Sequence, residues 1–142
     1  MDKIIGLLII CFVLMSCNLT TKKTGVEKTK PLMYEPSEMA ILMRQMYEVN
    51  KIAKTQIIGN NTLVSFPENF LTIHSAVLTD STDRDNEFDS LAAQFVNYQK
   101  SVFSSSSDST VYYFNKSINT CIACHKTRCT GPIPKIKKLL IH

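Results

Sequence analysis

Three residues near the carboxyl end of the chain have the types and spacing needed to bind a haem covalently. Cys121, Cys124 and His125 stand in the order Cys-x-x-Cys-His, the pattern that attaches c-type haem. Each thiol of such a pair can form a thioether to one vinyl group of the porphyrin, and the neighbouring histidine can ligate the iron. The motif therefore predicts one covalent haem c, attached through Cys121 and Cys124, with His125 as the proximal iron ligand.

The first residues of the chain resemble the export signal of a bacterial lipoprotein. Lys3 precedes an apolar run over residues 4–15, which is too short to span a bilayer and has the length of a signal-peptide core. The run leads into Leu-Met-Ser-Cys at residues 14–17, which resembles a lipobox. The resemblance implies that residues 1–16 are a signal peptide and that Cys17 carries a lipid. The alternative is an uncleaved membrane anchor.

This reading predicts four parts of the chain: the signal peptide, a tether, a haem domain and a tail. Residues 17–35 are rich in Thr and Lys and predict a flexible tether from acylated Cys17. Residues 36–130 are long enough for one haem domain, and residues 131–142 are expected to form a carboxyl-terminal tail. The net charge of +4 lies mainly in the tether and the tail, so nothing resembles a nucleic-acid footprint. We expect the haem domain in the periplasm, held to the cell envelope by lipid.

The pattern of apolar residues in the haem domain predicts four amphipathic helices and no strands. The helices are expected over about residues 37–58, 67–79 and 84–103, with the fourth capped by Asp108 or Ser109. The fold class is therefore all-α, an up-down-up-down four-helix bundle with the haem on the last helix. The expected inward residues are Met39, Leu42, Met43, Met46, Val49, Ala53 and Ile57 in the first helix; Phe70, Ile73, His74 and Val77 in the second; Phe88, Leu91, Phe95 and Val102 in the third; and Phe114, Ile118, Cys121 and His125 in the fourth, which also carries Val111.

A haem motif at the end of four helices resembles the class II c-type cytochromes, the cytochrome c′ and cytochrome c-556 group. The resemblance covers about residues 37–129 and includes an Arg-Gln pair at residues 44–45. In that family the haem is attached to the last helix, and the distal residue comes from the first. A distal methionine gives a six-coordinate iron that carries electrons, whereas a bulky aliphatic residue gives a five-coordinate iron that binds gases. Cys129 and the Gly-Pro-Ile-Pro-Lys sequence at residues 131–135 depart from the family pattern.

The distal ligand is expected among the methionines of the first helix. Met39, Met43 and Met46 fall within about 60° of one another on a helix surface. A thioether is a suitable axial ligand, although methionines at helical spacing are also ordinary core residues. Met43 is our choice because it lies in the middle of the stripe, with Met46 and then His74 as alternatives. Beside it, Arg44 is expected either to pair with a haem propionate or to be solvated.

The remaining cysteine of the domain has no assigned role. Cys129 is expected to be buried or to pack near the haem. A third thiol beside the motif also allows an alternative hypothesis without haem. In it, a lipoprotein is stabilised by a Cys₃His zinc site formed by Cys121, Cys124, His125 and Cys129.

Together these features predict a lipid-anchored monohaem electron carrier rather than an enzyme. Acidic residues gather before the third helix, where helix capping explains them, and no catalytic constellation stands beside the motif. The expected partners are redox proteins and the membrane, with no nucleic acid. Cytochromes c′ are often dimers, so a homodimer stays open. The main alternative is a five-coordinate protein of the cytochrome c′ type that binds nitric oxide.

Overall fold

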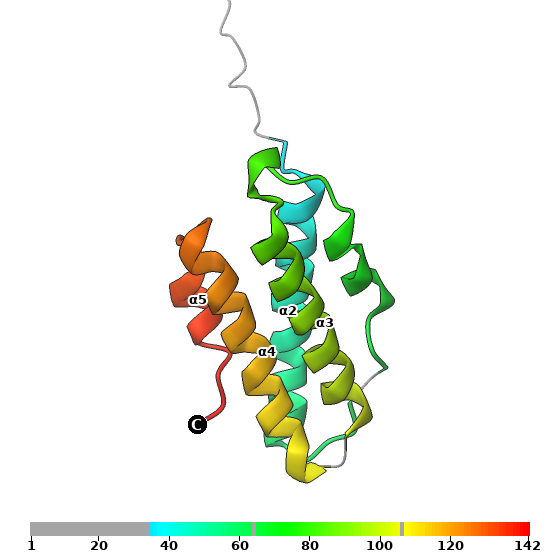
Figure 1. Cartoon of the computed structure of the whole chain (residues 1–142). Helices are drawn as coiled ribbons and strands as arrows, with labels where there is room; N and C mark the ends of the chain where they lie inside the picture. The colour runs from blue at the N-terminus through cyan, green and yellow to red at the C-terminus, as the bar shows by residue number, and fades with distance from the viewer. Residues whose placement is uncertain (1–34, 64, 106) are drawn as a thin grey trace, which may run out of the picture. The chain divides into compact units, whose positions relative to one another are not determined.

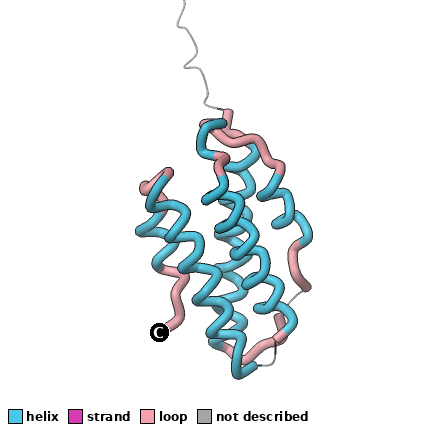
Figure 2. Tube along the Cα trace, in the orientation of Figure 1, coloured by secondary structure: helices cyan, strands magenta, loops and turns pink. Residues whose placement is uncertain are grey.

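The computed structural model describes residues 35–63, 65–105 and 107–142. The predicted signal peptide, Cys17 and the tether up to residue 34 lie outside the described residues. Within the described part all regular structure is helical, so the all-α prediction is confirmed there (Figure 2). None of the helices in these described segments combines the length and the apolar character that crossing a bilayer requires.

Three long helices carry the fold: α2 (Glu38–Ile58), α3 (Asn86–Ser104) and α4 (Ser107–Thr127). Two short 3₁₀ helices, η1 (Glu68–His74) and η2 (Ser81–Asp83), connect α2 to α3, and a short helix α5 (Ile133–Lys137) follows α4. The closest helix pair is α3 and α4, which run in opposite directions, while η1 lies beside α2 and α3 (Figure 1).

The helix boundaries follow the capping residues of the sequence. Ser37 caps α2, because its Oγ accepts a hydrogen bond from the Ala40 N–H at 3.1 Å. The helix ends at Gly59, and Asn60 follows with a φ of 50°, in the left-handed region that asparagine tolerates. Asp85 caps α3 in the same way as Ser37 caps α2. The predicted beginning and end of the first helix are therefore confirmed within one residue.

The second predicted helix differs from the expectation in type and in its buried face. It is a 3₁₀ helix, which has about three residues per turn and superposes positions i and i+3. Phe70 and Ile73 are therefore buried, and the face continues to Ala76 beyond the helix. The prediction that His74 and Val77 face inward, which assumed α-helical spacing, is wrong: both are exposed, Val77 to 61%.

Two apolar clusters fill the described part of the domain, and a buried polar triad joins the three long helices. The Gln99 Nε2 of α3 donates hydrogen bonds to Asn50 Oδ1 of α2 at 2.7 Å and to Ser117 Oγ of α4 at 2.9 Å. One cluster is made of Met39, Leu42, Met46, Phe70, Ile73, Ala76, Phe88, Ala92, Phe95 and Val96. The other is made of Ala53, Val102, Phe114, Ile118, Ile122, Ile136 and Leu139.

The segment expected to be a tail is part of the second cluster. Ile136 and Leu139 are buried against it. The Lys54 ammonium of α2 donates to the carbonyls of Lys138 at 2.9 Å and Leu140 at 2.8 Å. The chain breaks after α4 as the Gly-Pro sequence predicts, but proline is tolerated in the first turn of a new helix, so α5 begins at Ile133.

We predict that Leu139→Ala destabilises the domain, whereas Lys137→Ala does not. Leu139 is 4% exposed, and removing a buried leucine typically costs about 2–4 kcal/mol through lost burial and the cavity left behind. Lys137 is exposed, so its replacement should change the free energy of unfolding by less than about 0.5 kcal/mol. Urea titrations followed by far-ultraviolet circular dichroism measure both values. Equal stability of the two variants would show that the segment is a tail after all.

Candidate functional site

The Cys-x-x-Cys-His motif lies on the wall of a cavity formed by α2, η1, α3 and α4. The cavity has a volume of about 40 Å³. Two residues of the first helix, Met43 and Met46, line it together with the motif, although they are far away in the sequence. The complete lining is Met43, Met46, Ile73, Phe88, Leu91, Ala92, Phe95, Thr120, Cys121, Cys124 and His125.

The methionines of α2 differ in their relation to this cavity. Met46 is 5% exposed and belongs to the first apolar cluster, and Met43 is half-buried at the edge of that cluster. Met39 is buried in the same cluster but does not line the cavity. Two of the three candidate thioethers therefore lie on the cavity wall that the motif shares.

Two other candidate residues do not lie at the cavity. His74, the second alternative for the distal ligand, is exposed at the end of η1 and is not part of the lining. Arg44 is exposed on α2 and also lies outside the lining. The proposed pairing of Arg44 with a propionate stays a prediction.

Burial sets the acidity of the two motif thiols. Burial and, to a smaller extent, the neighbouring Cys124 together raise the pKa of the Cys121 thiol to about 12. Burial also raises the pKa of Cys124, while the Arg128 cation opposes that effect. Because the thiolate is the nucleophile, both thiols are protonated and weakly reactive at neutral pH in this conformation.

The imidazole of His125 is held in one tautomer. Its Nδ1 lies 2.9 Å from the backbone carbonyl oxygen of Cys129, and it is the last buried residue of α4. A carbonyl oxygen only accepts hydrogen bonds, so Nδ1 must carry the proton and donate it. In the neutral imidazole with this tautomer, Nε2 keeps its lone pair, which is the state that a histidine needs to ligate a metal ion.

Cys129 is exposed, so the expectation that it is buried is wrong. Its Sγ lies 3.2 Å from Nδ1 of His125, and its carbonyl oxygen is the acceptor described above. The residue follows the end of α4, where the chain leaves the core, which explains its exposure. The alternative expectation, packing near the haem, stays a prediction.

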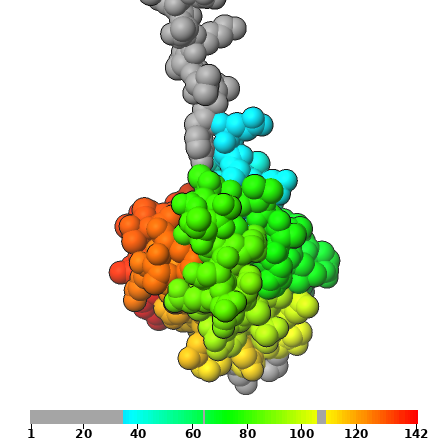
Figure 3. Space-filling view, turned by 45° about the horizontal axis from the view of Figure 1, so that its top comes forward, coloured from blue at the N-terminus to red at the C-terminus, as the bar shows by residue number. Residues whose placement is uncertain are grey.

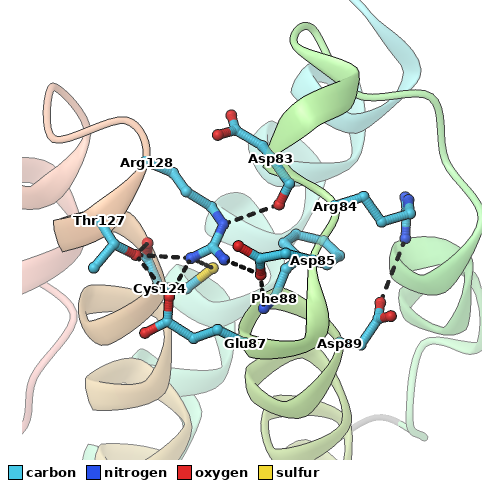
Figure 4. A network of polar contacts seen from close by, with 9 residues as sticks. All are labelled: Asp83, Arg84, Asp85, Glu87, Phe88, Asp89, Cys124, Thr127 and Arg128. Atoms are coloured by element: carbon cyan, nitrogen blue, oxygen red, sulfur yellow. Dashed lines mark hydrogen bonds and ion pairs between the residues drawn. The ribbon is translucent and has the colours of Figure 1, made fainter.

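Arg128 is a residue of the site that the sequence analysis did not identify. Its side chain is 6% exposed and donates to Asp85 and Glu87 at the beginning of α3 (Figure 4). Nη1 also lies 4.0 Å from the Sγ of Cys124. The available signal was the position of Arg128 four residues after Cys124, about one helical turn further along the chain, together with the acidic residues before the third helix.

The described residues give no support to the zinc alternative. Across the described segments, no three His, Cys, Asp or Glu side chains are grouped so that they would hold a metal ion. Comparisons with protein-family models, curated proteins and solved structures give no match. A functional interpretation therefore depends on the motif, the cavity and the residues around them.

We predict that the thiols of the haem-free protein react with iodoacetamide in the order Cys129, Cys124, Cys121. Cys129 is exposed, Cys124 and Cys121 are both half-buried, and the pKa of the Cys121 thiol is raised to about 12. Each rate should rise with pH as thiolate forms, and Cys121 should be the last to respond. Peptide mass spectrometry after timed labelling between pH 7 and about 10 measures the order.

In denaturant the three labelling rates should converge, because burial no longer distinguishes the thiols. A Cys121 thiol that reacts as fast as Cys129 in the folded protein would contradict the described burial.

Proposed function

We propose that this protein is a monohaem c-type cytochrome that carries electrons, with haem bonded to Cys121 and Cys124 and ligated by His125. The observation that carries the proposal is the shared cavity. The motif and two methionines from a distant helix line the same apolar space, so the residues suited to both faces of a haem iron lie together.

The donor set of this cavity suits a haem. The two cysteines present thiols for thioethers, and the tautomer of His125 leaves Nε2 free for iron. Phe88, Phe95 and the other apolar residues of the lining would exclude water from the porphyrin. A bound haem would supply an iron that changes between the ferrous and ferric states, while the chain sets its ligation, burial and orientation.

The cavity must widen to take a porphyrin. Its volume of about 40 Å³ is well below the roughly 300–1,000 Å³ of ordinary small-molecule sites. Since α3 and α4 are the closest helix pair, we expect α2 and η1 to move away from them when haem binds. The triad of Asn50, Gln99 and Ser117 should keep the far half of the helices together during this movement.

The arrangement that we propose for the haem domain is the four-helix bundle of the class II cytochromes. In it α2 is the first helix, η1 occupies the place of the second, and α3 and α4 follow. The lipid on Cys17, the periplasmic location and redox proteins as partners are parts of the same proposal, and they are based on the export signal and the motif.

The first experiment tests covalent haem directly. The chain is produced in a bacterium with an active cytochrome-maturation pathway, and its mass and haem stain are measured after denaturation. We expect the mass of one haem bound covalently. Cys121→Ala and Cys124→Ala should each weaken attachment, because one thioether is lost, while the matched variant Cys129→Ser should retain the haem.

A colourless protein with the mass of the polypeptide and its lipid alone would overturn the proposal. Zinc in that colourless protein would favour the alternative site formed by the cysteines and His125.

A second prediction concerns the distal ligand. Met43→Leu should remove the near-infrared band typical of thioether ligation and let the reduced protein bind carbon monoxide, because Met43 is the half-buried thioether at the cavity edge. Met46→Leu should keep the band and lower the free energy of unfolding by less than about 1.5 kcal/mol, as expected for a swap that conserves volume. Absorption spectra with and without carbon monoxide separate the two variants.

The opposite result would assign ligation to Met46. Rapid carbon monoxide binding by the unaltered reduced protein would instead favour the five-coordinate alternative.

A further inference from the structure

We propose that Arg128 is a positioning residue for the haem-binding motif, because it clamps the end of α4 to the beginning of α3. The inference rests on the proposed function. It states that the clamp keeps Cys124 and His125 facing the methionine wall, so that the iron is ligated from both sides.

Every guanidinium nitrogen of Arg128 takes part in the clamp. Nε donates to the carbonyl oxygen of Asp83 at 3.0 Å, Nη2 donates to Asp85 Oδ1, and Nη1 donates to Glu87 Oε2 at 3.3 Å. Nη1 also donates to the Thr127 hydroxyl at 2.7 Å. The planar guanidinium fork suits such a set of acceptors, which a lysine ammonium cannot reproduce with the same geometry.

The clamp is continuous with the cavity wall through Phe88. The Arg128 guanidinium carbon lies 5.7 Å from the centre of the Phe88 ring, and this ring is 3% exposed and lines the cavity. Asp85, which accepts from Arg128, also caps α3 by accepting from the Phe88 N–H at 2.7 Å. One carboxylate therefore connects the arginine to the beginning of the helix that carries Phe88 (Figure 4).

The part of α4 held by the clamp is the part that carries the motif. Cys124 and His125 occupy the last turn of α4, and helix ends fray unless something outside the helix holds them. Arg128 lies between His125 and Cys129, whose carbonyl oxygen accepts a hydrogen bond from His125 Nδ1. The orientation of the imidazole therefore depends on the path of the backbone at Arg128. On the surface, the end of α4 meets the residues around the beginning of α3 (Figure 3).

Arg84 provides a matched control on the same ring. Its guanidinium carbon lies 5.0 Å from the centre of Phe88, and it donates to the carbonyls of His74 and Ala76, each at 2.8 Å. It forms an ion pair with Asp89 at 3.9 Å, within its own part of the chain. Arg84 therefore fastens the connection between η1 and α3, and among the described side chains it has no hydrogen bond or ion pair to α4.

The experiment compares Arg128→Met, Arg128→Lys and Arg84→Met in the haem-loaded full chain. Arg128→Met should keep the covalent haem and lose at least about half of the near-infrared thioether band, while carbon monoxide binding by the reduced protein increases. Arg128→Lys should restore part of the band, because one cation remains. Arg84→Met should lower the melting temperature without losing the band.

A second measurement needs no haem. In the haem-free chain, hydrogen exchange of the amides at residues 122–128 should accelerate about tenfold in Arg128→Met, while residues 112–118 exchange as in the unaltered protein. Glu87→Gln should produce a smaller acceleration in the same segment, because it removes one acceptor of the clamp.

An Arg128→Met variant with the full near-infrared band and unchanged hydrogen exchange would overturn this inference and leave the proposed function standing. The inference would also be overturned if Arg128→Met and Arg84→Met both lost the band in proportion to the decrease in their melting temperatures. That result would indicate that Arg128 has a purely structural role. An unaltered protein without covalent haem would contradict the proposed function itself.

Discussion

The candidate site depends on one constraint: packing fixes which face of α4 points toward the interior. Phe114 and Ile118 are completely buried, and Ser117 between them is bonded to Gln99. Because a helix advances by about 100° per residue, a helix fixed at these positions must also turn Cys121 and His125 toward the interior. The packing of the far half of α4 therefore orients the motif residues at its end.

Features that depend on neighbouring residues, such as the beginnings of helices, were predictable from the sequence. Ser37 and Asp85 cap their helices because a short polar side chain can satisfy the free N–H groups of the first turn. The 3₁₀ form of η1 was not predictable, because a single turn of apolar spacing fits three or four residues per turn almost equally well. The burial of Ile136 and Leu139 was missed because prolines before them indicated only the end of a helix.

The candidate site was predictable where one segment holds its residues and unpredictable where distant segments meet. The Cys-x-x-Cys-His spacing identified its own three residues, and helical periodicity brought Met43 and Met46 to one face. The contact of Arg128 with Asp85 joins residues more than forty positions apart, and an exposed arginine would look the same in the sequence. The exposure of Cys129 likewise depends on where the chain turns after α4, which no short motif encodes.

The buried triad of Asn50, Gln99 and Ser117 has a consequence for how the protein can change over evolutionary time. Gln99 donates to both other members, and all three side chains are buried. Replacing one member alone leaves a buried polar group without its partner, which costs about 1–3 kcal/mol. The three positions should therefore accept new residues only as a set, so that substitutions at them become fixed together.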